Sequence, residues 1–326
     1  MIRMAVAGLA HPHGLSFLEN ACRTGRVEPV GFFDGEDRAR AVAAADRFGV
    51  PCLDSFDALL QTGADVLLTA AVNSCKADYI VRALSAGLGV ITDKPMAVTL
   101  EELAQIEAAA AATGAPLFLL LTERYSPPIY TARQWIGRGA IGEVVQQHLC
   151  RPHRLRPENR PDWMFHRAQY GGILNDLAVH DIDLACYFSG RAMRRVLAAH
   201  VSNARFPQLT DFCDNGIALF EMSHGGTASI EVNWLTPDAY RAHGDVRFFL
   251  TGTRGFLSIS TVDASVRLCT DTEPERLLEL IEPPCTCEED ALAKMADWSY
   301  PSLISTADSI AATRFALLAQ QAAEAF

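Results

Sequence analysis

Two different periodicities of hydrophobic residues divide the chain. As far as Leu121, short apolar runs alternate with segments in which apolar residues recur at helical spacing. This pattern predicts strands at 2–7, 30–33, 66–71, 90–91 and 117–121, and helices at 14–23, 38–48, 56–61, 77–86 and 100–113. Because the strands are apolar throughout, they predict a parallel sheet covered by helices on both faces. Such an arrangement is typical of a doubly wound nucleotide-binding domain.

After Thr122 the pattern changes. A segment rich in arginine and proline runs from 151 to 167, and a strongly apolar helix is predicted at 172–188. The rest predicts a final helix at 307–326, a hairpin turn at 224–226, and strands at 196–201, 215–221, 227–234, 246–250, 256–259 and 265–269. Consecutive strands with short turns predict a large, mostly antiparallel open sheet. We therefore expect an α/β domain over 1–122 and an α+β domain over 123–326.

Composition narrows the class of protein. Of 326 residues, 49% are hydrophobic and 21% are charged, which is typical of a globular chain. The 28 cationic side chains face 39 acidic ones, and the net charge of -11 argues against nucleic acid or a membrane surface as partner. No stretch is long enough to span a membrane and no secretory leader is evident, so we expect a cytoplasmic protein. The nine scattered cysteines are expected to stay reduced, and no metal site is expected.

The loop after the first strand is the first candidate binding site. It reads Gly8-Leu9-Ala10-His11-Pro12-His13-Gly14, where a dinucleotide-binding domain has G-x-G-x-x-G. Glycines there allow a tight turn and let pyrophosphate approach the N-terminus of the following helix. Only the first glycine is matched, since Ala10 and His13 occupy the other two positions. Taken alone, the loop fits either a cofactor site or an ordinary strand-to-helix turn.

A second position favours the cofactor site. Asp34 ends the second strand, twenty residues beyond Gly14, where an acid accepts hydrogen bonds from the adenosine ribose hydroxyls. A carboxylate there also repels a 2′-phosphate, so NAD is favoured over NADP. The alternative is that Asp34 and Gly35 form a simple turn.

The same loop has a rival interpretation. His11-x-His13 after an apolar strand is also how barrel-type metal-dependent hydrolases begin, with both imidazoles on one divalent metal. That class needs further ligands at later strand ends, for which His148, His153, His180 and His200 are available. The antiparallel pattern of the second half argues against a barrel.

Two further motifs carry titratable side chains. The strand at 90–91 leads into Asp93-Lys94-Pro95, and a lysine at the carboxyl edge of a parallel strand lies where open α/β sheets bind ligands. In the predicted helix, Asp176, His180 and Asp183 share one face while the other faces are apolar. A titratable stripe on an otherwise buried helix needs partners or a binding site. A helix with its polar edge in water is the alternative.

Together these motifs resemble the glucose-fructose oxidoreductase, inositol dehydrogenase and rhizopine catabolism (Gfo/Idh/MocA) family. Residues 93–95 are similar to the E-K-P loop of that family, and residues 171–183 to its G-G-x-L-x-D-x-G-x-H-x-x-D helix. Weaker agreement at 64–66, Asn73, 124–127, 142–144 and 252–255 extends the resemblance over nearly the whole chain. The chain departs from the family pattern at Ala10, His13, Val72, Lys76, Asp93 and Ala178.

The resemblance implies a Rossmann domain and an NAD(P)-dependent dehydrogenase or reductase acting on a secondary alcohol of a sugar, polyol or sugar-acid derivative. It implies His180 as the general base, Lys94 as the donor to the reacting oxygen, and Asp176 as the residue that orients both substrate and base. Cofactor contacts are implied for Gly8, Leu9, Ala10, His11, His13, Asp34, Ala71, Asn73 and Lys94. Substrate contacts are implied for Arg124, Arg151, Trp163, Asp176 and His180.

The arginine-rich segment suggests an acidic substrate. Arginine suits carboxylate or phosphate and Trp163 can pack on a sugar ring, although a solvated loop explains the composition equally well. The segment contains Arg151, Arg154, Arg156, Arg160 and Arg167.

Two expectations about partners and function complete the interpretation. We expect a homodimer or homotetramer formed through the C-terminal sheet. A dinucleotide-binding sensor without turnover is the alternative function, and the joint presence of Lys94, Asp176 and His180 argues against it.

Overall fold

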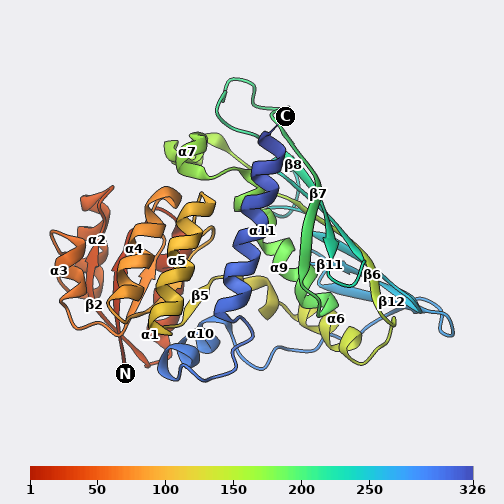
Figure 1. Ribbon diagram of the computed structural model, residues 1–326, viewed down its shortest axis with the longest axis horizontal. Coiled ribbons are helices and arrows are strands. Elements are labelled where there is room, and N and C mark those ends of the chain that lie inside the picture. The colour runs from red at the N-terminus through yellow and green to blue at the C-terminus, as the bar shows by residue number, and fades with distance from the viewer. Residues whose placement is uncertain (326) are drawn as a thin grey trace. The chain divides into compact units, whose positions relative to one another are not determined.

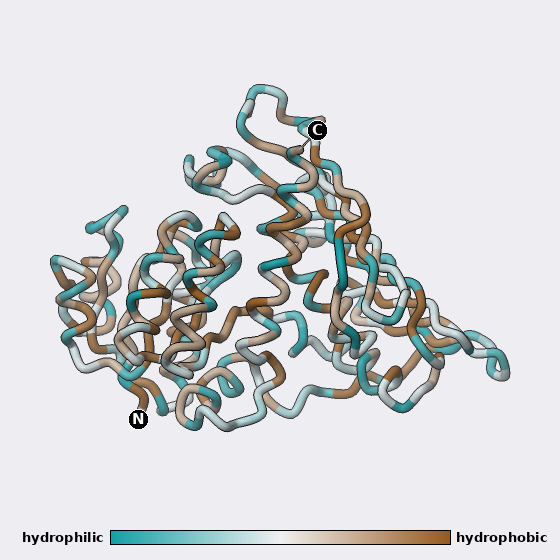
Figure 2. Tube along the Cα trace, viewed as in Figure 1, coloured by the Kyte–Doolittle hydropathy of each residue, from teal (hydrophilic) through white to brown (hydrophobic). Residues whose placement is uncertain are grey.

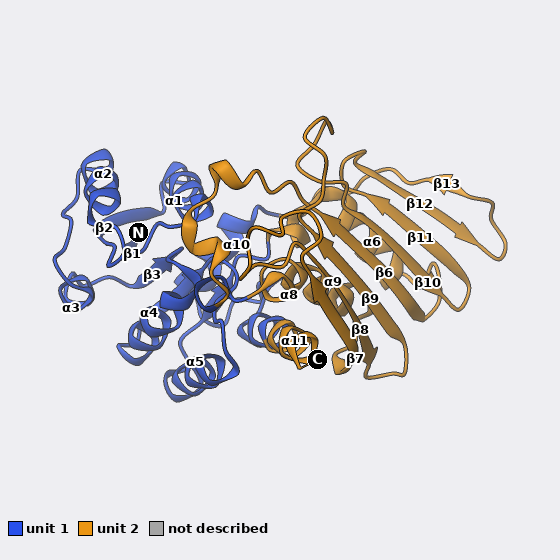
Figure 3. Ribbon diagram, turned by 90° about the horizontal axis from the view of Figure 1, so that it is seen from above, with its two compact units in different colours: residues 1–121, 168–171, 285–313 blue, residues 122–167, 172–284, 314–326 orange. Residues whose placement is uncertain are grey.

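The computed structural model describes residues 1–325, and the chain divides into two compact units. The first comprises 1–121, 168–171 and 285–313, and the second comprises 122–167, 172–284 and 314–326 (Figure 3). The predicted boundary after residue 122 lies beside this division. The inclusion of 285–313 in the first unit differs from the prediction of two continuous domains, because a chain that returns to an earlier unit leaves no break in composition. Phe326, the predicted end of the last helix, lies outside the described residues.

The first unit contains the predicted parallel sheet. Its strands are β1 (Ile2–Ala7), β2 (Val27–Phe33), β3 (Val66–Thr69), β4 (Gly89–Thr92) and β5 (Leu117–Leu119), in the order β2-β1-β3-β4-β5. All four neighbouring pairs are parallel. The chain leaves β1 toward β2 on one side and returns to β3 on the other side. The carboxyl ends of β1 and β3 therefore meet at the switch point, where open α/β sheets bind ligands.

Helices cover both faces of this sheet. They are α1 (Pro12–Arg23), α2 (Arg38–Phe48), α3 (Phe56–Leu60), α4 (Asn73–Ser85), α5 (Leu100–Thr113) and α10 (Cys287–Ala296). Figure 3 shows α1 on one side of the sheet and α4 and α5 on the other. Their ends follow local chemistry, since α5 begins with a capping box between Thr99 and Glu102 and ends at Gly114. The central strands are buried on both faces, as their uninterrupted apolar sequences predict.

The edge strand of this sheet is also covered. The backbone N–H groups of Leu117 and Leu119 donate to the hydroxyls of Thr306 and Ser309, at 3.0 and 3.2 Å. Both hydroxyls belong to the start of α11 (Thr306–Glu324). An exposed edge would present unpaired donors to other chains. The returning segment therefore satisfies the backbone groups that β5 would otherwise leave open.

The second unit contains the predicted, mostly antiparallel sheet. Its strands are β6 (Val144–Pro152), β7 (Met193–Ser202), β8 (Asn215–Met222), β9 (Thr227–Asn233), β10 (Arg247–Gly252), β11 (Gly255–Ser260), β12 (Ser265–Thr270) and β13 (Arg276–Leu277). They are ordered β13-β12-β11-β10-β6-β9-β8-β7, and only β6 and β9 are parallel neighbours. The sequence pattern missed β6, the strand that joins the two halves of the sheet. Two of its inward positions are Gln147 and Arg151, polar side chains that hide the alternation.

Helices cover one face of this sheet. They are α6 (Pro127–Gly137), α8 (Ile173–Asp176) and α9 (Ala178–Ser189), and α9 packs against β6 and β9 (Figure 1). The helix predicted at 172–188 is thus two helices that meet at Leu177. The bounds of the remaining short elements are α7 (Arg167–Tyr170), η1 (Thr122–Tyr125), η2 (Pro157–Asn159) and η3 (Asp162–Phe165).

Hydropathy follows this layering. Helical traces carry alternating hydrophilic and hydrophobic bands (Figure 2). On β8 the buried positions alternate with the exposed apolar side chains of Ile217 and Leu219, and Phe249 on β10 is 41% exposed. Within the described chain, no helix has both the length and the hydropathy that a membrane span requires.

Candidate active site

The loop after β1 is built around Gly8. Its φ is +73°, and a Cβ added there would lie 2.3 Å from the Cβ of Ala71, which follows β3. The Gly8 N–H donates to the carbonyl of Phe33 at 2.8 Å. The first glycine of the motif is therefore required by both backbone conformation and space. Ala71, predicted at the cofactor site, is its direct neighbour.

This geometry gives a matched pair of predictions. Gly8→Ala should lower the free energy of unfolding by about 2 kcal/mol or more, because a strained φ and an overpacked contact add together. Gly25→Ala is the control, since Gly25 has a φ of +69° but nothing lies within 4 Å of an added Cβ. It should cost only about 1 kcal/mol. Urea unfolding of both variants measures the difference, and equal losses would contradict close packing at Gly8.

Asp34 ties the turn after β2 to the loop after β1. Its Oδ2 accepts from the Leu9 N–H at 3.1 Å, and its Oδ1 accepts from the N–H groups of Glu36 and Asp37 at 3.0 and 3.1 Å. Nη1 of Arg40 lies 3.5 Å from Oδ2. Asp34 therefore forms the simple turn of the alternative interpretation. It also stands beside the glycine loop, as the cofactor interpretation requires.

The two histidines of the loop contact a carboxylate in the loop after β4. Nδ1 of His11 lies 3.0 Å from Oδ2 of Asp93, and Nδ1 of His13 lies 3.2 Å from Oδ1. Burial lowers the pKa of His11, although Asp93 opposes the shift. Burial alone would raise the pKa of Asp93, but His11 and His13 together hold it well below its usual range. The two imidazoles therefore favour the charged form of the Asp93 carboxylate. Ala10, which directly precedes His11, is half-buried, and His13 is exposed.

A buried lysine holds the loop that carries Lys94. Lys76 is fully buried, and its Nζ donates to the backbone carbonyls of Asp93, Lys94 and Pro95 at 3.3, 3.0 and 3.2 Å. A fourth bond at 3.0 Å runs to Oδ1 of Asn73, the first residue of α4. Three consecutive carbonyls thus converge on one ammonium group. Lys94 itself is 8% exposed, and its peptide bond to Pro95 is cis.

Sequence reasoning noted Lys76 only as a departure from the family pattern. The signal that would have revealed its role is burial: the residue falls on the apolar face of α4, where an ammonium group needs several acceptors. Asn73, predicted to contact cofactor, also donates from Nδ2 to the carbonyl of Tyr170 at 2.8 Å. It therefore joins Lys76 in the support of this loop.

In the second unit, Asp176 ends α8 and His180 lies in the first turn of α9. Leu177 keeps a helical backbone, and its N–H bonds to the carbonyl of Ile173 at 2.9 Å. The four-residue spacing therefore still places Asp176 and His180 on one side of the helical path. Asp176 is 5% exposed and His180 is half-buried. The predicted stripe is thus mostly withdrawn from solvent.

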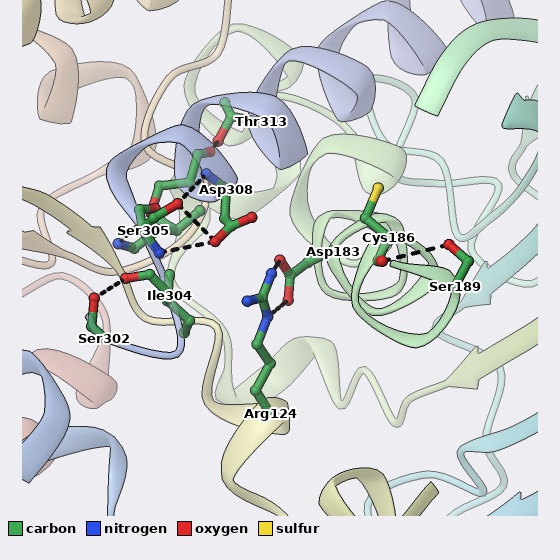
Figure 4. A network of polar contacts seen from close by, with 11 residues as sticks. Arg124, Asp183, Cys186, Ser189, Ser302, Ile304, Ser305, Asp308 and Thr313 are labelled. Atoms are coloured by element: carbon green, nitrogen blue, oxygen red, sulfur yellow. Dashed lines mark hydrogen bonds and ion pairs between the residues drawn. The ribbon is translucent and has the colours of Figure 1, made fainter. Parts of the chain in front are cut away.

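The third member of the stripe pairs with a predicted substrate residue. Nε and Nη2 of Arg124 donate to the two carboxylate oxygens of Asp183 at 2.8 and 2.5 Å (Figure 4). This bidentate pair is buried and anchors η1 to α9. Substrate contact by Arg124 stays a prediction, and its ion pair with Asp183 also supports the helix that carries His180.

Arg151 has the same kind of role on β6. Its guanidinium donates to Asp181 through Nε and Nη2, at 2.9–3.1 Å, and to Glu123 through Nη1 at 2.9 Å. Although burial opposes it, Asp181 and Glu123 raise the pKa of Arg151 above its usual value. Substrate contact by Arg151 stays a prediction, and its observed partners are Asp181 and Glu123. The sequence analysis did not single out Asp181, which lies two residues before Asp183 on the same helix.

The other arginines of the segment also have partners within the chain. Arg154 donates to three backbone carbonyls, Arg156 pairs with Asp238, Arg160 donates to the carbonyls of residues 154 and 155, and Arg167 pairs with Glu324. The hypothesis of an acidic substrate therefore loses the side chains on which it depended. Trp163 differs from them, because its buried Nε1 has no hydrogen-bond partner among residues 1–325.

Comparison with known proteins places this geometry in a family. The model of the NAD-binding Rossmann-fold domain of the GFO/IDH/MocA oxidoreductases matches residues 2–120, and that of the C-terminal domain matches residues 129–258. An NAD(+)-dependent scyllo-inositol 2-dehydrogenase of Bacillus subtilis is 24% identical over 228 residues, 69% of this chain and 64% of that protein. The chain thus spans just under two thirds of the length of that curated relative.

Solved structures extend the match to the full length. A putative oxidoreductase from Erwinia carotovora atroseptica superposes with a TM-score of 0.88 at 30% identity, covering 99% of both chains. A levoglucosan dehydrogenase in complex with NADH and levoglucosan has the same fold, with a TM-score of 0.83 at 19% identity over 99% of this chain and 97% of that one. The resemblance drawn from the motifs is confirmed, and the chain belongs to the GFO/IDH/MocA family of oxidoreductases.

Proposed function

We propose that this protein is an NAD-dependent dehydrogenase or reductase that transfers a hydride between the nicotinamide and a secondary alcohol of a sugar or polyol. The observation that carries the proposal is the way Lys94 is presented. Four acceptors fix Lys76, and Lys76 in turn fixes the loop of Lys94 at the carboxyl end of β4. Burying the charge of Lys76 costs free energy. A loop supported in this way indicates that Lys94 has a functional role.

The residues around Gly8 fit a dinucleotide. The absence of a Cβ leaves room against Ala71, and Asp34 offers a carboxylate beside the loop. NAD, when bound, supplies the hydride acceptor or donor of the reaction. Leu9, Ala10, His11 and His13 complete the set of loop residues that we propose to contact it.

We assign three roles in the chemistry to this chain. His180 takes the hydroxyl proton, because an imidazole titrates near neutral pH. Lys94 donates a hydrogen bond to the reacting oxygen and stabilises its developing negative charge. Asp176 orients the substrate and His180. Arg124 and Arg151 act as positioning residues, through their ion pairs with the helix of His180.

The preference for NAD gives a prediction at Asp34. Asp34→Asn keeps an oxygen that can accept from the N–H groups of Glu36 and Asp37, but it removes the negative charge that repels a 2′-phosphate. We expect the ratio of NADP to NAD affinity to rise at least about tenfold, which corresponds to about 1.4 kcal/mol. Calorimetric titration with both dinucleotides measures the ratio. An unchanged ratio with intact folding would contradict the assignment of Asp34 to the ribose.

The substrate class rests on Trp163 more than on arginine. The buried indole N–H of Trp163 has no acceptor among the described residues, and an aromatic ring with one donor suits a hydroxyl-rich ring. Since the arginines of the segment have internal partners, we propose neutral sugars or polyols over uronic and aldonic acids. Relative rates on the two sets test this choice, and higher rates on the acids would reverse it.

The two alternative functions, a barrel-type hydrolase and a dinucleotide-binding sensor, differ in their support. A barrel-type hydrolase is excluded because the described residues form two open sheets with linear strand orders. A dinucleotide-binding sensor remains the second candidate, and the observation that favours it is the replacement of two loop glycines by Ala10 and His13. Thermal stabilisation by NAD together with NADH production on a polyol panel distinguishes the two, since a sensor gives only the first.

Two further expectations belong to this proposal. The exposed apolar side chains of Ile217, Leu219 and Phe249 support assembly into a homodimer or homotetramer through the sheet of the second unit. A cytoplasmic location agrees with nine free cysteines among the described residues.

A further inference from the structure

His11, His13 and Asp93 form a compact cluster of metal-ligating groups. The two imidazole centroids are 4.1 Å apart, and the three ligand atoms all lie within 4.8 Å of one another. Each histidine directs its Nδ1 at a different oxygen of the same carboxylate, at 3.0 and 3.2 Å. The loop after β1 and the loop after β4 thus converge on one point.

The backbone fixes both loops independently of any ligand. The His11 N–H donates to the carbonyl of Ala70 at 3.0 Å, and the Asp93 N–H donates to the carbonyl of Thr69 at 2.9 Å. Consecutive carbonyls at the end of β3 therefore hold the two ligating segments. Pro12 begins α1 directly after His11 and restricts the backbone between the two histidines. Such support is what a preorganised site requires.

The distances suit a small divalent ion. Zn²⁺ binds imidazole nitrogen and carboxylate oxygen at about 2.0–2.2 Å, which places tetrahedral ligand atoms about 3.3–3.5 Å apart. The two contacts to Asp93 are 3.0 and 3.2 Å, so a slight widening would admit the ion. Two imidazoles and a carboxylate are also a common set of three zinc ligands, with the fourth position left open.

One oxygen of the cluster is fully buried beside an imidazole. Oδ2 of Asp93 is buried and has no hydrogen-bond partner among residues 1–325, although Nδ1 of His11 lies 3.0 Å away. That nitrogen caps α1 by accepting from the His13 N–H at 3.5 Å. Either a proton on Nδ1 or a cation between the two atoms would satisfy this contact, and a cation could also be reached by the second imidazole.

We propose that His11, His13 and Asp93 bind one divalent transition-metal ion of the Zn²⁺ class. The site is separate from the proposed roles of Lys94, Asp176 and His180, and it requires no metal in hydride transfer. Because it lies in the loop proposed to contact NAD, metal and dinucleotide are titrated separately. Absence of metal binding then does not count against NAD binding, and absence of NAD binding does not count against the metal site.

The test is calorimetric titration of Zn²⁺ into the full chain, without a histidine tag and after removal of metals with a chelator. We expect one ion per chain. His13→Ala should weaken binding at least about 100-fold, beyond the 10–100-fold typical of losing an outer-shell partner. His13 is suited to this test because 58% of its side chain is exposed, so its removal leaves the core intact. Asp93→Asn should give a comparable loss.

Two controls separate this site from weaker ones. His166 pairs with Asp162 at 2.9 Å on the surface, one histidine and one carboxylate without a second imidazole, so His166→Ala should leave the affinity unchanged. Co²⁺ absorption should show nitrogen and oxygen ligands without thiolate charge-transfer bands, which excludes the free cysteines. Equal affinity in wild type and His13→Ala, absence of one-site binding, or thiolate bands would each overturn the proposal.

Discussion

Replacing His180 by Asn is expected to lower turnover about 100- to 10,000-fold while the protein stays folded. Asn preserves much of the shape and polarity of the ring but cannot accept the hydroxyl proton, and general base catalysis contributes a factor of that size. Lys94→Ala should cost about 100- to 1,000-fold, because it removes the donor to the developing negative charge. Steady-state rates of NADH production measure both losses.

Matched variants show whether these losses are specific. His166→Asn changes an exposed histidine that pairs with Asp162, and Lys294→Ala removes a lysine outside the Lys94 loop. Both should retain wild-type rates. Near wild-type turnover in His180→Asn or Lys94→Ala, with unchanged circular dichroism, would contradict the assigned roles.

Replacing Lys76 by Met is expected to lower the free energy of unfolding by at least about 3 kcal/mol. The substitution keeps most of the length of the side chain but removes the buried donor to three backbone carbonyls and Oδ1 of Asn73, although the carbonyl of Asp93 keeps a second donor, the Thr92 hydroxyl. It should also lower kcat more than it raises KM, because Lys76 positions the loop of Lys94 and does not touch substrate. Urea unfolding and steady-state kinetics provide the two readouts.

Lys294→Met is the matched control for this variant. Nζ of Lys294 also donates to backbone carbonyls, those of Trp298 and Tyr300 at 2.6 and 3.0 Å, but the residue is only half-buried. Water can replace the lost donor there, so the cost should be about 1 kcal/mol or less, with no change in kcat. Equal losses in the two variants would show that the burial of Lys76 adds nothing to the free energy of unfolding.

Most of the first unit was predictable because its signals are local. Continuous apolar runs gave all five strands, and caps such as Thr99 and Gly114 sit at the ends of the predicted helices. The prediction failed for the return of 285–313 and for β6. In both cases the deciding contacts join residues far apart in sequence, such as Leu117 with Thr306, and a periodicity cannot report them.

The sequence suggests which residues belong to the candidate site, but it does not show their hydrogen-bond and ion-pair partners. Lys94, Asp176 and His180 stay predictions that rest on motif, spacing and the family resemblance. Arg124 and Arg151 carried the same residue type that binds anions, and only the structure pairs them with Asp183 and Asp181. Lys76 shows the same limit, since the three carbonyls that bind it belong to the backbone and leave no mark in the sequence.

The central claim is that this chain transfers hydride between NAD and a secondary alcohol. The most direct measurement incubates the protein with NAD⁺ and a panel of neutral sugars and polyols deuterated at their secondary carbinol carbons, and follows the label by mass spectrometry. The account predicts deuterated NADH with at least one member of the panel, and loss of that product in His180→Asn. Binding of NAD by folded protein with no labelled NADH from any member would contradict it and would favour the sensor.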